Sequence, residues 1–307
     1  MSRIDEAMRR ASQASHAGRV STRGTDGSAS LRLADDCTLN EYPLEGRGAR
    51  VEMPLASEPR VSSERVPPAP LQSQKRRALT SPDQASSGKL VVGAAHDMVA
   101  AEQYRRLAAA LHDAQVGKGL KTVMVTSAVP REGKTLTVVN LALTLSESYG
   151  RRVLLVDADL RRPSVHEVLR VHNDRGLSEV LVSNRMDLPL TEVSERLWVL
   201  PAGHGERSPL AVLSSDRMRK FLEDVAGRFD WVLLDTPPVG LLPDAQVLGR
   251  LVHAAVFVIR AGVTPFAAVD RAIADLGREY IIGTVLNDVD PSALPATSYY
   301  GHYYLQP

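Results

Sequence analysis

The chain has 307 residues, 44% of them hydrophobic, so it can build the core of one large domain or of two small ones. Its formal net charge of +1 argues against a general nucleic-acid binder, which would carry a basic surface. The single cysteine, Cys37, has nothing to pair with, which excludes a cysteine-ligated cluster or zinc site within one chain and fits a reducing cytoplasm.

The first 88 residues are expected to form a flexible, largely disordered arm. Every Trp and Phe lies beyond residue 190, and only one of the eight Tyr residues precedes residue 100, so this part has little to bury. Residues 18–89 are rich in Ser, Pro, Gly and Arg, as linkers are. Residues 2–11 have the pattern of a short helix, either transient or used for docking.

No apolar run approaches the roughly 18 residues that a membrane-spanning helix needs. The N-terminus has Arg residues but no apolar stretch after them, so it does not look like a secretion signal. We therefore expect a cytoplasmic protein that a partner recruits to the inner face of the membrane.

The segment SAVPREGKT (Ser127–Thr135) follows a strand-like apolar run and precedes a helix-like segment, 140–148. This strand–loop–helix context is the one a phosphate-binding loop needs. Gly133 lets the backbone approach the phosphates, Lys134 can reach their β and γ oxygens, and Thr135 can offer its hydroxyl to Mg²⁺. The other loop residues expected to bind nucleotide are Ala128, Val129, Pro130, Arg131, Glu132 and Leu136.

The loop departs from the usual pattern at its start. Ala128 stands where Gly is usual, six residues before the Lys, and Pro130 stiffens the loop. Because Ala tolerates fewer backbone angles than Gly, the loop must enter with an ordinary φ. An accidental GKT in a plain strand–turn–helix connection is the alternative, and two downstream segments weigh against it.

Two further strand-like apolar runs are followed by aspartates. In VLLVDADLRRP the run is followed by Asp157 and Asp159, and in WVLLDTPP it is followed by Asp235. The carboxyl ends of parallel strands form the ligand crevice of an α/β sheet. The second segment has the Walker B pattern, which holds Mg²⁺ directly or through water. A lone strand-end Asp is more often a helix cap or turn residue, but three strand ends with such groups favour a nucleotide site.

Alternating patterns along the rest of the chain predict a mostly parallel sheet with helices on both faces. A helix is expected over Met98–Asp113, with Val99, Leu107 and Leu111 facing the core. The predicted strands lie near residues 121–127, 152–157, 197–200, 229–235, 254–260 and 281–286.

Together, AVPREGKT, VDADLRRP, LLDTPP and a tyrosine cluster at the C-terminus resemble the bacterial tyrosine kinases (BY-kinases) of capsule and exopolysaccharide biosynthesis, over roughly residues 100–307. The resemblance implies a MinD-like (SIMIBI) P-loop NTPase domain at 89–290, after an arm at 1–88 and before a flexible tyrosine-rich tail at 291–307. It implies an ATP- and Mg²⁺-dependent tyrosine kinase that autophosphorylates its tail and regulates polysaccharide polymerisation or export. The phosphoacceptors would be Tyr299, Tyr300, Tyr303 and Tyr304.

The same resemblance implies that Lys134, Asp157 and Asp159 are catalytic. Asp157 would accept the tyrosine proton, although the two aspartates could exchange roles. Asn287 follows the last predicted strand, where related P-loop folds contact adenine with an Asn; an exposed turn Asn is an equal alternative. The expected Mg²⁺ ligands are Thr135, Asp159 and Asp235.

Partners are implied in the same way. The family assembles rings through a Glu-x-x-Arg-x-x-Arg motif; Glu102 and Arg105 match it, but the third position is Ala108, so a ring or dimer stays open unless Arg106 compensates. A transmembrane activator of the chain-length-determinant type and a tyrosine phosphatase are implied, and nucleic acid is not.

Two other functions remain as alternatives. A Min/Par-type positioning ATPase shares the fold but carries a signature Lys five residues before the Walker Lys, where this chain has Val129. A non-catalytic adaptor would bind nucleotide and present the arm and tail to a polysaccharide secretion complex. Formation of phosphotyrosine with Mg·ATP separates the kinase from both.

Overall fold

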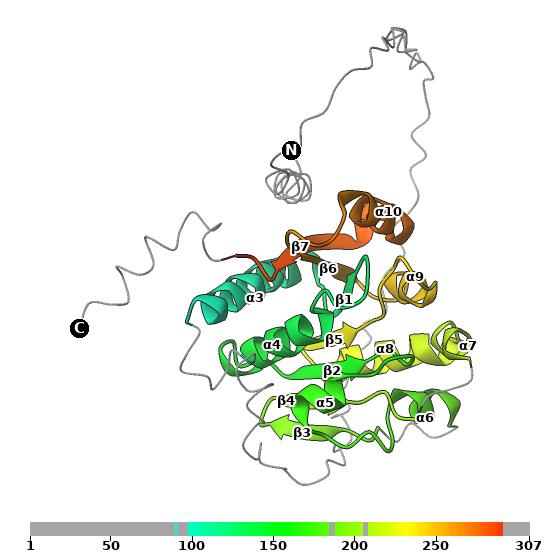
Figure 1. Cartoon of the computed structure of the whole chain (residues 1–307). Coiled ribbons are helices and arrows are strands. Elements are labelled where there is room, and N and C mark those ends of the chain that lie inside the picture. The colour runs from blue at the N-terminus through cyan, green and yellow to red at the C-terminus, as the bar shows by residue number, and fades with distance from the viewer. Residues whose placement is uncertain (1–89, 91–97, 184–187, 205–207, 291–307) are drawn as a thin grey trace, which may run out of the picture. The chain divides into compact units, whose positions relative to one another are not determined.

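The computed structural model describes residues 90, 98–183, 188–204 and 208–290 (Figure 1). Three parts expected from the sequence lie outside these residues: the arm at 1–88, its helix at 2–11 and the tail at 291–307. The four tail tyrosines, Tyr299, Tyr300, Tyr303 and Tyr304, are among them.

The described residues form one seven-stranded sheet in the order β3-β4-β2-β5-β1-β6-β7. Neighbouring strands pair in parallel except for β3, which is antiparallel to β4. The strands are β1 (Thr122–Ser127), β2 (Val153–Asp157), β3 (Thr191–Ser194), β4 (Leu197–Leu200), β5 (Trp231–Asp235), β6 (Ala254–Arg260) and β7 (Ile281–Asn287). Every residue of β1, β2 and β5 is buried, which explains why these strands are apolar runs rather than alternating patterns.

Helices cover both faces of the sheet (Figure 1). On one face lie α3 (Met98–Lys118), α4 (Lys134–Glu147) and α5 (Val165–Leu169). On the other lie α6 (Leu177–Val182), α7 (Pro209–Leu213), α8 (Asp216–Arg228), α9 (Asp244–Gly249) and α10 (Phe266–Leu276), and a 3-10 turn, η1 (Arg278–Tyr280), precedes β7. The predicted doubly covered, mostly parallel sheet is confirmed.

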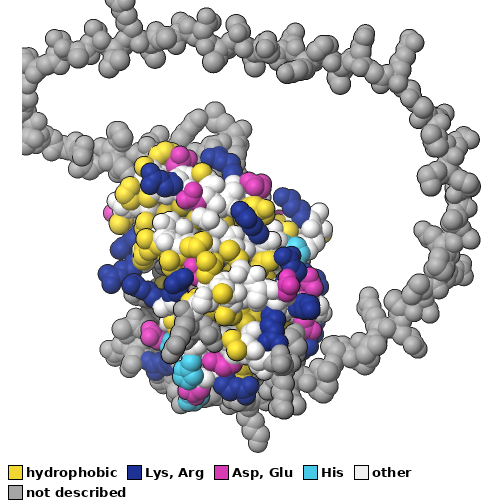
Figure 2. All heavy atoms as spheres, turned by 90° about the vertical axis from the view of Figure 1, so that its right-hand side faces the viewer, with side chains coloured by type: hydrophobic (Ala, Val, Ile, Leu, Met, Phe, Trp, Pro, Cys, Tyr) yellow, Lys and Arg dark blue, Asp and Glu magenta, His cyan; other side chains and the backbone are white. Residues whose placement is uncertain are grey.

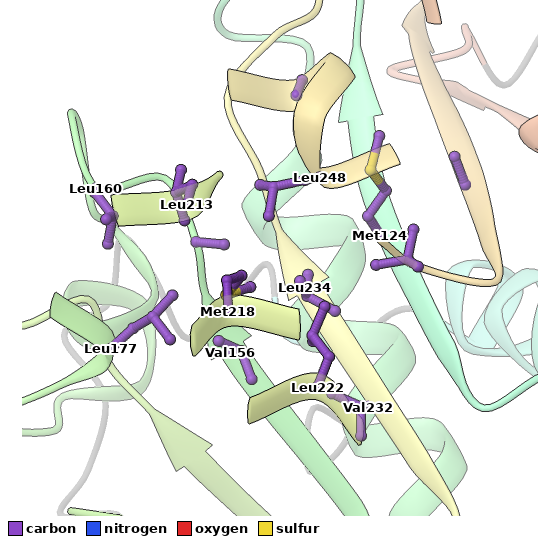
Figure 3. Packing of buried hydrophobic residues seen from close by; sticks show 14 of the residues in the cluster. Met124, Val156, Leu160, Leu177, Leu213, Met218, Leu222, Val232, Leu234 and Leu248 are labelled. Atoms are coloured by element: carbon purple, nitrogen blue, oxygen red, sulfur yellow. The ribbon is translucent and has the colours of Figure 1, made fainter. Parts of the chain in front are cut away.

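Alternate residues of each strand supply the two cores. Met124 of β1 and Leu234 of β5 face the second set of helices, where they meet Met218 of α8 and Leu248 of α9 in one cluster (Figure 3). Their neighbour Val125 points to the opposite core, with α4. The apolar residues of the strands are buried in these two cores. The polar residues at the carboxyl ends of the parallel strands lie together at one edge of the sheet.

Three expectations about the elements need correction. β3 was not predicted, and the helix expected over Met98–Asp113 continues to Lys118. Val99 is 45% exposed rather than core-facing, whereas Ala108 is fully buried. The reason is that Val99 lies in the first turn of α3, roughly 13 Å along the axis before the residue that packs on α4.

Hydrophobic side chains lie between charged ones on the face shown in Figure 2. Large exposed hydrophobic residues of the described chain include Leu241, Val263 and Phe266. No helix among residues 98–183, 188–204 and 208–290 is both long enough and apolar enough to cross a membrane.

Candidate active site

The predicted phosphate-binding loop connects β1 to α4, and Lys134 is the first residue of that helix. Gly133 precedes it with φ 91°, and Arg131 also has a positive φ of 64°. Ala128 is not among the residues with positive φ, as its side chain requires. The segment after β5 contacts the start of the loop, where the Gly240 amide donates to the Ala128 carbonyl at 3.2 Å. A Cβ on Gly240 would lie 2.6 Å from that oxygen.

Asn287, at the end of β7, reaches the same loop. Its Nδ2 donates to the carbonyl oxygen of Glu132 at 2.9 Å, and a Cβ on Gly133 would lie 2.0 Å from that nitrogen. Gly133 is therefore needed for its left-handed backbone and for the space it leaves. The side chain of Asn287 is therefore hydrogen-bonded to the phosphate-binding loop and does not lie free in an exposed turn.

The Thr135 hydroxyl joins the loop to the end of β5. Its Oγ1 donates to Asp235 Oδ2 at 2.6 Å and lies 2.9 Å from Ser164 Oγ. Asp235 is 1% exposed, and its Oδ1 has no hydrogen-bond partner among the described residues. Burial raises the pKa of Asp235 to about 7, although the Thr135 hydrogen bond and the nearby Lys134 charge oppose the shift.

A buried carboxylate oxygen without a partner, beside a threonine hydroxyl, fits a hard divalent cation. Mg²⁺ is typically held by one or two carboxylates, waters and substrate phosphates rather than by a full protein cage. The described part of the chain contains no group of three or more His, Cys, Asp or Glu side chains that could hold a metal. The residues at this point fit Mg²⁺ bound together with a nucleotide.

Asp157 is fully buried at the end of β2, in register with Asp235 on the adjacent strand. Its Oδ1 accepts the Asp159 amide at 3.2 Å, and its Oδ2 accepts the amides of Ser164 and Val165 at 3.0 and 3.1 Å. Burial, and then the nearby Asp235 carboxylate, raises the pKa of Asp157 well above its ordinary value. Asp157 thus anchors the loop that leads from β2 to α5.

Asp159 is only partly buried in that loop. Its Oδ1 accepts the Arg162 amide at 3.1 Å. Burial raises the pKa of Asp159, while that amide and the Lys134 charge lower it. Asp157, the last residue of β2, is buried, so Asp159 is the one of these two aspartates with solvent access.

An ion pair that the sequence analysis missed holds the same loop to α9. Arg161 Nε donates to Asp244 Oδ1 and Arg161 Nη2 donates to Asp244 Oδ2, each at 3.2 Å, and Asp244 is 1% exposed. No local pattern could have revealed the Arg161–Asp244 pair, because its members are 83 positions apart and belong to separate elements. The sequence analysis also missed Ser164, whose hydroxyl contacts Thr135.

The loop after β1 and the aspartates at the ends of β2 and β5 meet because β2, β5 and β1 are neighbours in the sheet. Hydrogen bonds bring Thr135 to Asp235 and Asn287 to Glu132, while Lys134 is close enough to shift the pKa values of Asp159 and Asp235. The tail tyrosines lie outside the described residues, so their distance from this site is not defined.

The AAA domain family model matches residues 129–267. Tyrosine-protein kinase YwqD of Bacillus subtilis is 35% identical over 204 residues, which cover 65% of this chain and 86% of YwqD. The chain belongs to the bacterial tyrosine kinase family. Tyrosine-protein kinase Etk of Escherichia coli is 34% identical over 207 residues, but these cover only 28% of Etk, so the BY-kinase described here spans less than a third of that relative.

Solved structures agree with this assignment. The kinase domain of Escherichia coli tyrosine kinase ETK matches this BY-kinase with a TM-score of 0.63 and 30% identity, over 72% of this chain and 86% of that one. The BceF tyrosine kinase domain matches with a TM-score of 0.55 and 32% identity, over 61% and 76% of the two chains. The match is to kinase domains, and the P-loop NTPase fold expected from the sequence is confirmed.

Proposed function

We propose that this BY-kinase is an ATP- and Mg²⁺-dependent protein tyrosine kinase that autophosphorylates its C-terminal tyrosines. The observation that carries the proposal is the Thr135–Asp235 pair beside Lys134, with a buried Asp235 oxygen left for a cation. Relatives named tyrosine-protein kinases support the transfer of phosphate to tyrosine. A role in regulating exopolysaccharide or capsule export is supported by a relative named succinoglycan biosynthesis transport protein ExoP, of Rhizobium meliloti, which is 30% identical over 223 residues.

The phosphate groups of ATP would be held by the loop amides and by Lys134, the first residue of α4. Thr135, Asp159 and Asp235 would hold Mg²⁺, directly or through water. The bound ion would supply charge neutralisation at the transferred phosphoryl group. The residues' own contribution is positioning: the Thr135–Asp235 hydrogen bond fixes the hydroxyl toward the carboxylate.

Asp157 is assigned the acceptance of the tyrosine proton. Its raised pKa suits a group that must take up a proton, and three amide hydrogen bonds leave about one of a carboxylate's four lone-pair sites for it. The exposure of Asp159 supports the opposite assignment, in which Asp157 only positions the loop. Separate substitution of the two residues distinguishes these roles.

The parts outside the described residues complete the proposal. Residues 1–88 would be a flexible arm, 89–290 the kinase domain and 291–307 the tail that offers Tyr299, Tyr300, Tyr303 and Tyr304. Each phosphotyrosine adds about −1.5 to −2 charges, so a fully modified tail gains roughly −6 to −8 and would repel its neighbours. We propose a cytoplasmic protein recruited by a transmembrane activator and reset by a tyrosine phosphatase.

The test is intact-mass analysis of the full chain beside Lys134→Met, after phosphatase treatment and again after Mg·ATP. A cytoplasmic fragment of a candidate activator is added in a parallel sample. Phosphate increments on the wild type alone, mapped to the tail tyrosines, are expected. ATP hydrolysis without any increment would instead indicate a positioning ATPase, and nucleotide binding without hydrolysis would indicate an adaptor.

A further inference from the structure

A buried carboxylate lies inside the phosphate-binding loop itself. Glu132 is 1% exposed and stands two residues before Lys134. Its Oε2 accepts the Val129 amide, within the loop, at 2.8 Å. Its Oε1 accepts the Arg260 amide at 3.2 Å and the Thr264 hydroxyl. Burying a charged group is unfavourable unless several donors compensate, and here three donors from two segments do so.

The loop needs such support because of its backbone. Arg131 and Gly133, the two neighbours of Glu132, have φ values of 64° and 91°. A left-handed conformation is sparsely populated for a residue with a Cβ, such as Arg131, and persists only where surrounding contacts enforce it. The bond from Glu132 to the Val129 amide closes the loop across Arg131, so the carboxylate enforces this conformation directly.

The same residue ties the loop to the ends of β6 and β7. Arg260 is the last residue of β6, and Thr264 precedes α10. The carbonyl oxygen of Glu132 accepts Asn287 Nδ2 from β7. Those two strand ends are themselves joined, because Arg260 Nη2 lies 2.7 Å from Asp288 Oδ2. Glu132 therefore connects the phosphate-binding loop to the ends of β6 and β7, which the Arg260–Asp288 ion pair joins.

The three donors also determine where the negative charge of Glu132 lies relative to the phosphate site. A free carboxylate two residues before the phosphate-binding Lys134 would repel the anion that the loop must bind. The donors at Val129, Arg260 and Thr264 hold both oxygens in hydrogen bonds, on the side of the loop that faces β6 and α10. An acidic residue is thus compatible with an anion site here, because hydrogen bonds from Val129, Arg260 and Thr264 stabilise its charge.

We propose that Glu132 is a positioning residue for nucleotide binding, which holds the loop amides and Lys134 in the geometry that receives the phosphates. The inference rests on the proposed function only in taking the loop after β1 as the nucleotide site. It does not depend on which group is phosphorylated. Glu132 was expected from the sequence as one of several loop residues; its contacts give it a separate role.

The central variant is Glu132→Gln in the full chain, with Mg·ADP as the probe in calorimetric titration. Gln has the same size, but its nitrogen cannot accept a hydrogen bond, so the Val129 or the Arg260 amide loses its acceptor. An unsatisfied buried donor of this kind is expected to weaken Mg·ADP binding about tenfold to a hundredfold. Glu223→Gln, the same substitution at an exposed residue of α8, is the matched control and should bind as the wild type does.

Two more variants separate positioning from charge and from folding. Glu132→Asp keeps the charge but is one methylene shorter, so it cannot reach the Val129 and Arg260 amides together and should lose affinity as Gln does. Thr264→Val removes one donor and leaves the carboxylate, and it should weaken binding by a smaller factor. A thermal melt without nucleotide, run on each variant, shows whether the folded fraction is unchanged.

Wild-type affinity for Mg·ADP in folded Glu132→Gln would overturn the inference. If that variant fails to fold, Thr264→Val decides, and unchanged affinity there would overturn it equally. A merely structural role predicts a lower melting temperature with unchanged affinity of the folded protein. Phosphotyrosine formation by the wild type is measured in parallel: if it is absent while Mg·ADP binds, the proposed function fails and the role of Glu132 is still judged from the affinities.

Discussion

Thr135 Oγ1 donates a hydrogen bond of 2.6 Å to Asp235 Oδ2, which joins the start of α4 to the end of β5. The two residues are 100 positions apart, and they meet because β1 and β5 are neighbours in the parallel sheet. The bond holds one carboxylate oxygen, and the other oxygen has no partner among the described residues. The pair therefore holds the hydroxyl and the carboxylate together at the point where a cation would be bound.

Thr135→Val should raise the Mg²⁺ concentration needed for nucleotide binding by about tenfold or more, because it removes the hydroxyl and leaves Asp235 buried without its donor. Thr135→Ser keeps the hydroxyl and should lie close to the wild type. The measurement is a Mg²⁺ titration of fluorescent-nucleotide binding. Equal Mg²⁺ requirements for the Val and Ser variants would remove Thr135 from the metal site.

Mg²⁺ binding should depend on pH with a midpoint near the raised pKa of Asp235, about 7. The ion binds the ionised carboxylate, so protons compete with it, and the apparent affinity should fall up to about tenfold per pH unit below that value. Calorimetric titration of Mg²⁺ with nucleotide at several pH values is the check. A profile that is flat through pH 7 would contradict Asp235 as a ligand.

The nucleotide-free protein should show the opposite trend in stability. Because burial raises the pKa of Asp235 in the folded state, that state holds the proton more tightly than the unfolded chain does. The contribution is fully present below the unfolded pKa of about 4 and is lost as pH rises through about 7. Melting temperatures in EDTA should fall over this window, and Asp235→Asn should reduce the slope, while the raised pKa values of Asp157 and Asp159 keep part of it.

Most of the sheet could be predicted because six of its strands are apolar runs bounded by turns. β3 could not be predicted: all four of its residues, Thr191–Ser194, are half-buried, and three of them are polar. It is a strand because its backbone pairs with β4 at the sheet edge, and that pairing leaves no apolar pattern in its own sequence.

The candidate site could be predicted in part for a similar reason. Asp157 and Asp235 are the last residues of β2 and β5, and Lys134 belongs to the GKT segment at the start of α4, so a local pattern marks each of them. The partners of Glu132 and Arg161 are distant residues on other elements, and side-chain pairing across a fold has no local signature. Sequence alone therefore identified the groups near the ligand better than the groups that hold them in place.

Asp157→Asn and Asp159→Asn should affect different steps. At saturating Mg·ATP, Asp157→Asn should slow phosphotyrosine formation about 10²–10⁴-fold if Asp157 accepts the proton, while nucleotide affinity stays near the wild-type value. Asp159→Asn should mainly raise the Mg²⁺ requirement. Single-turnover labelling combined with nucleotide titration measures both. The reverse pattern would assign the proton to Asp159 and leave Asp157 as the anchor of its loop.

Arg161→Gln should destabilise the protein by about 1–3 kcal/mol, because Asp244 would keep a buried charge without its partner. The estimate lies below the cost of breaking a fully buried pair, since the Arg161 side chain is 37% exposed. Urea unfolding is the measurement. Arg162→Gln is the matched control: Arg162 is exposed and contributes its backbone amide to Asp159, which the substitution keeps, so a change within about 0.5 kcal/mol is expected.

Ala108→Arg, which would restore the third position of the family's assembly motif, should unfold or strongly destabilise this protein. Ala108 is fully buried in the cluster between α3 and α4, and an arginine there must be buried without a partner or displace the helix. The neighbouring Ala110→Arg is the control, because Ala110 is exposed and should change stability by no more than about 0.5 kcal/mol. Melting temperature and sedimentation velocity are measured for both.

The remaining charges of that motif already pair within α3. Glu102 lies 3.3 Å from Arg105 and 3.8 Å from Arg106, so one carboxylate serves both guanidinium groups. Ala108 is fully buried and so is not available for contact with a second chain in this packing. A stable Ala108→Arg variant that assembles into larger species would show that α3 can rotate to present that position, and would contradict the buried packing described for it.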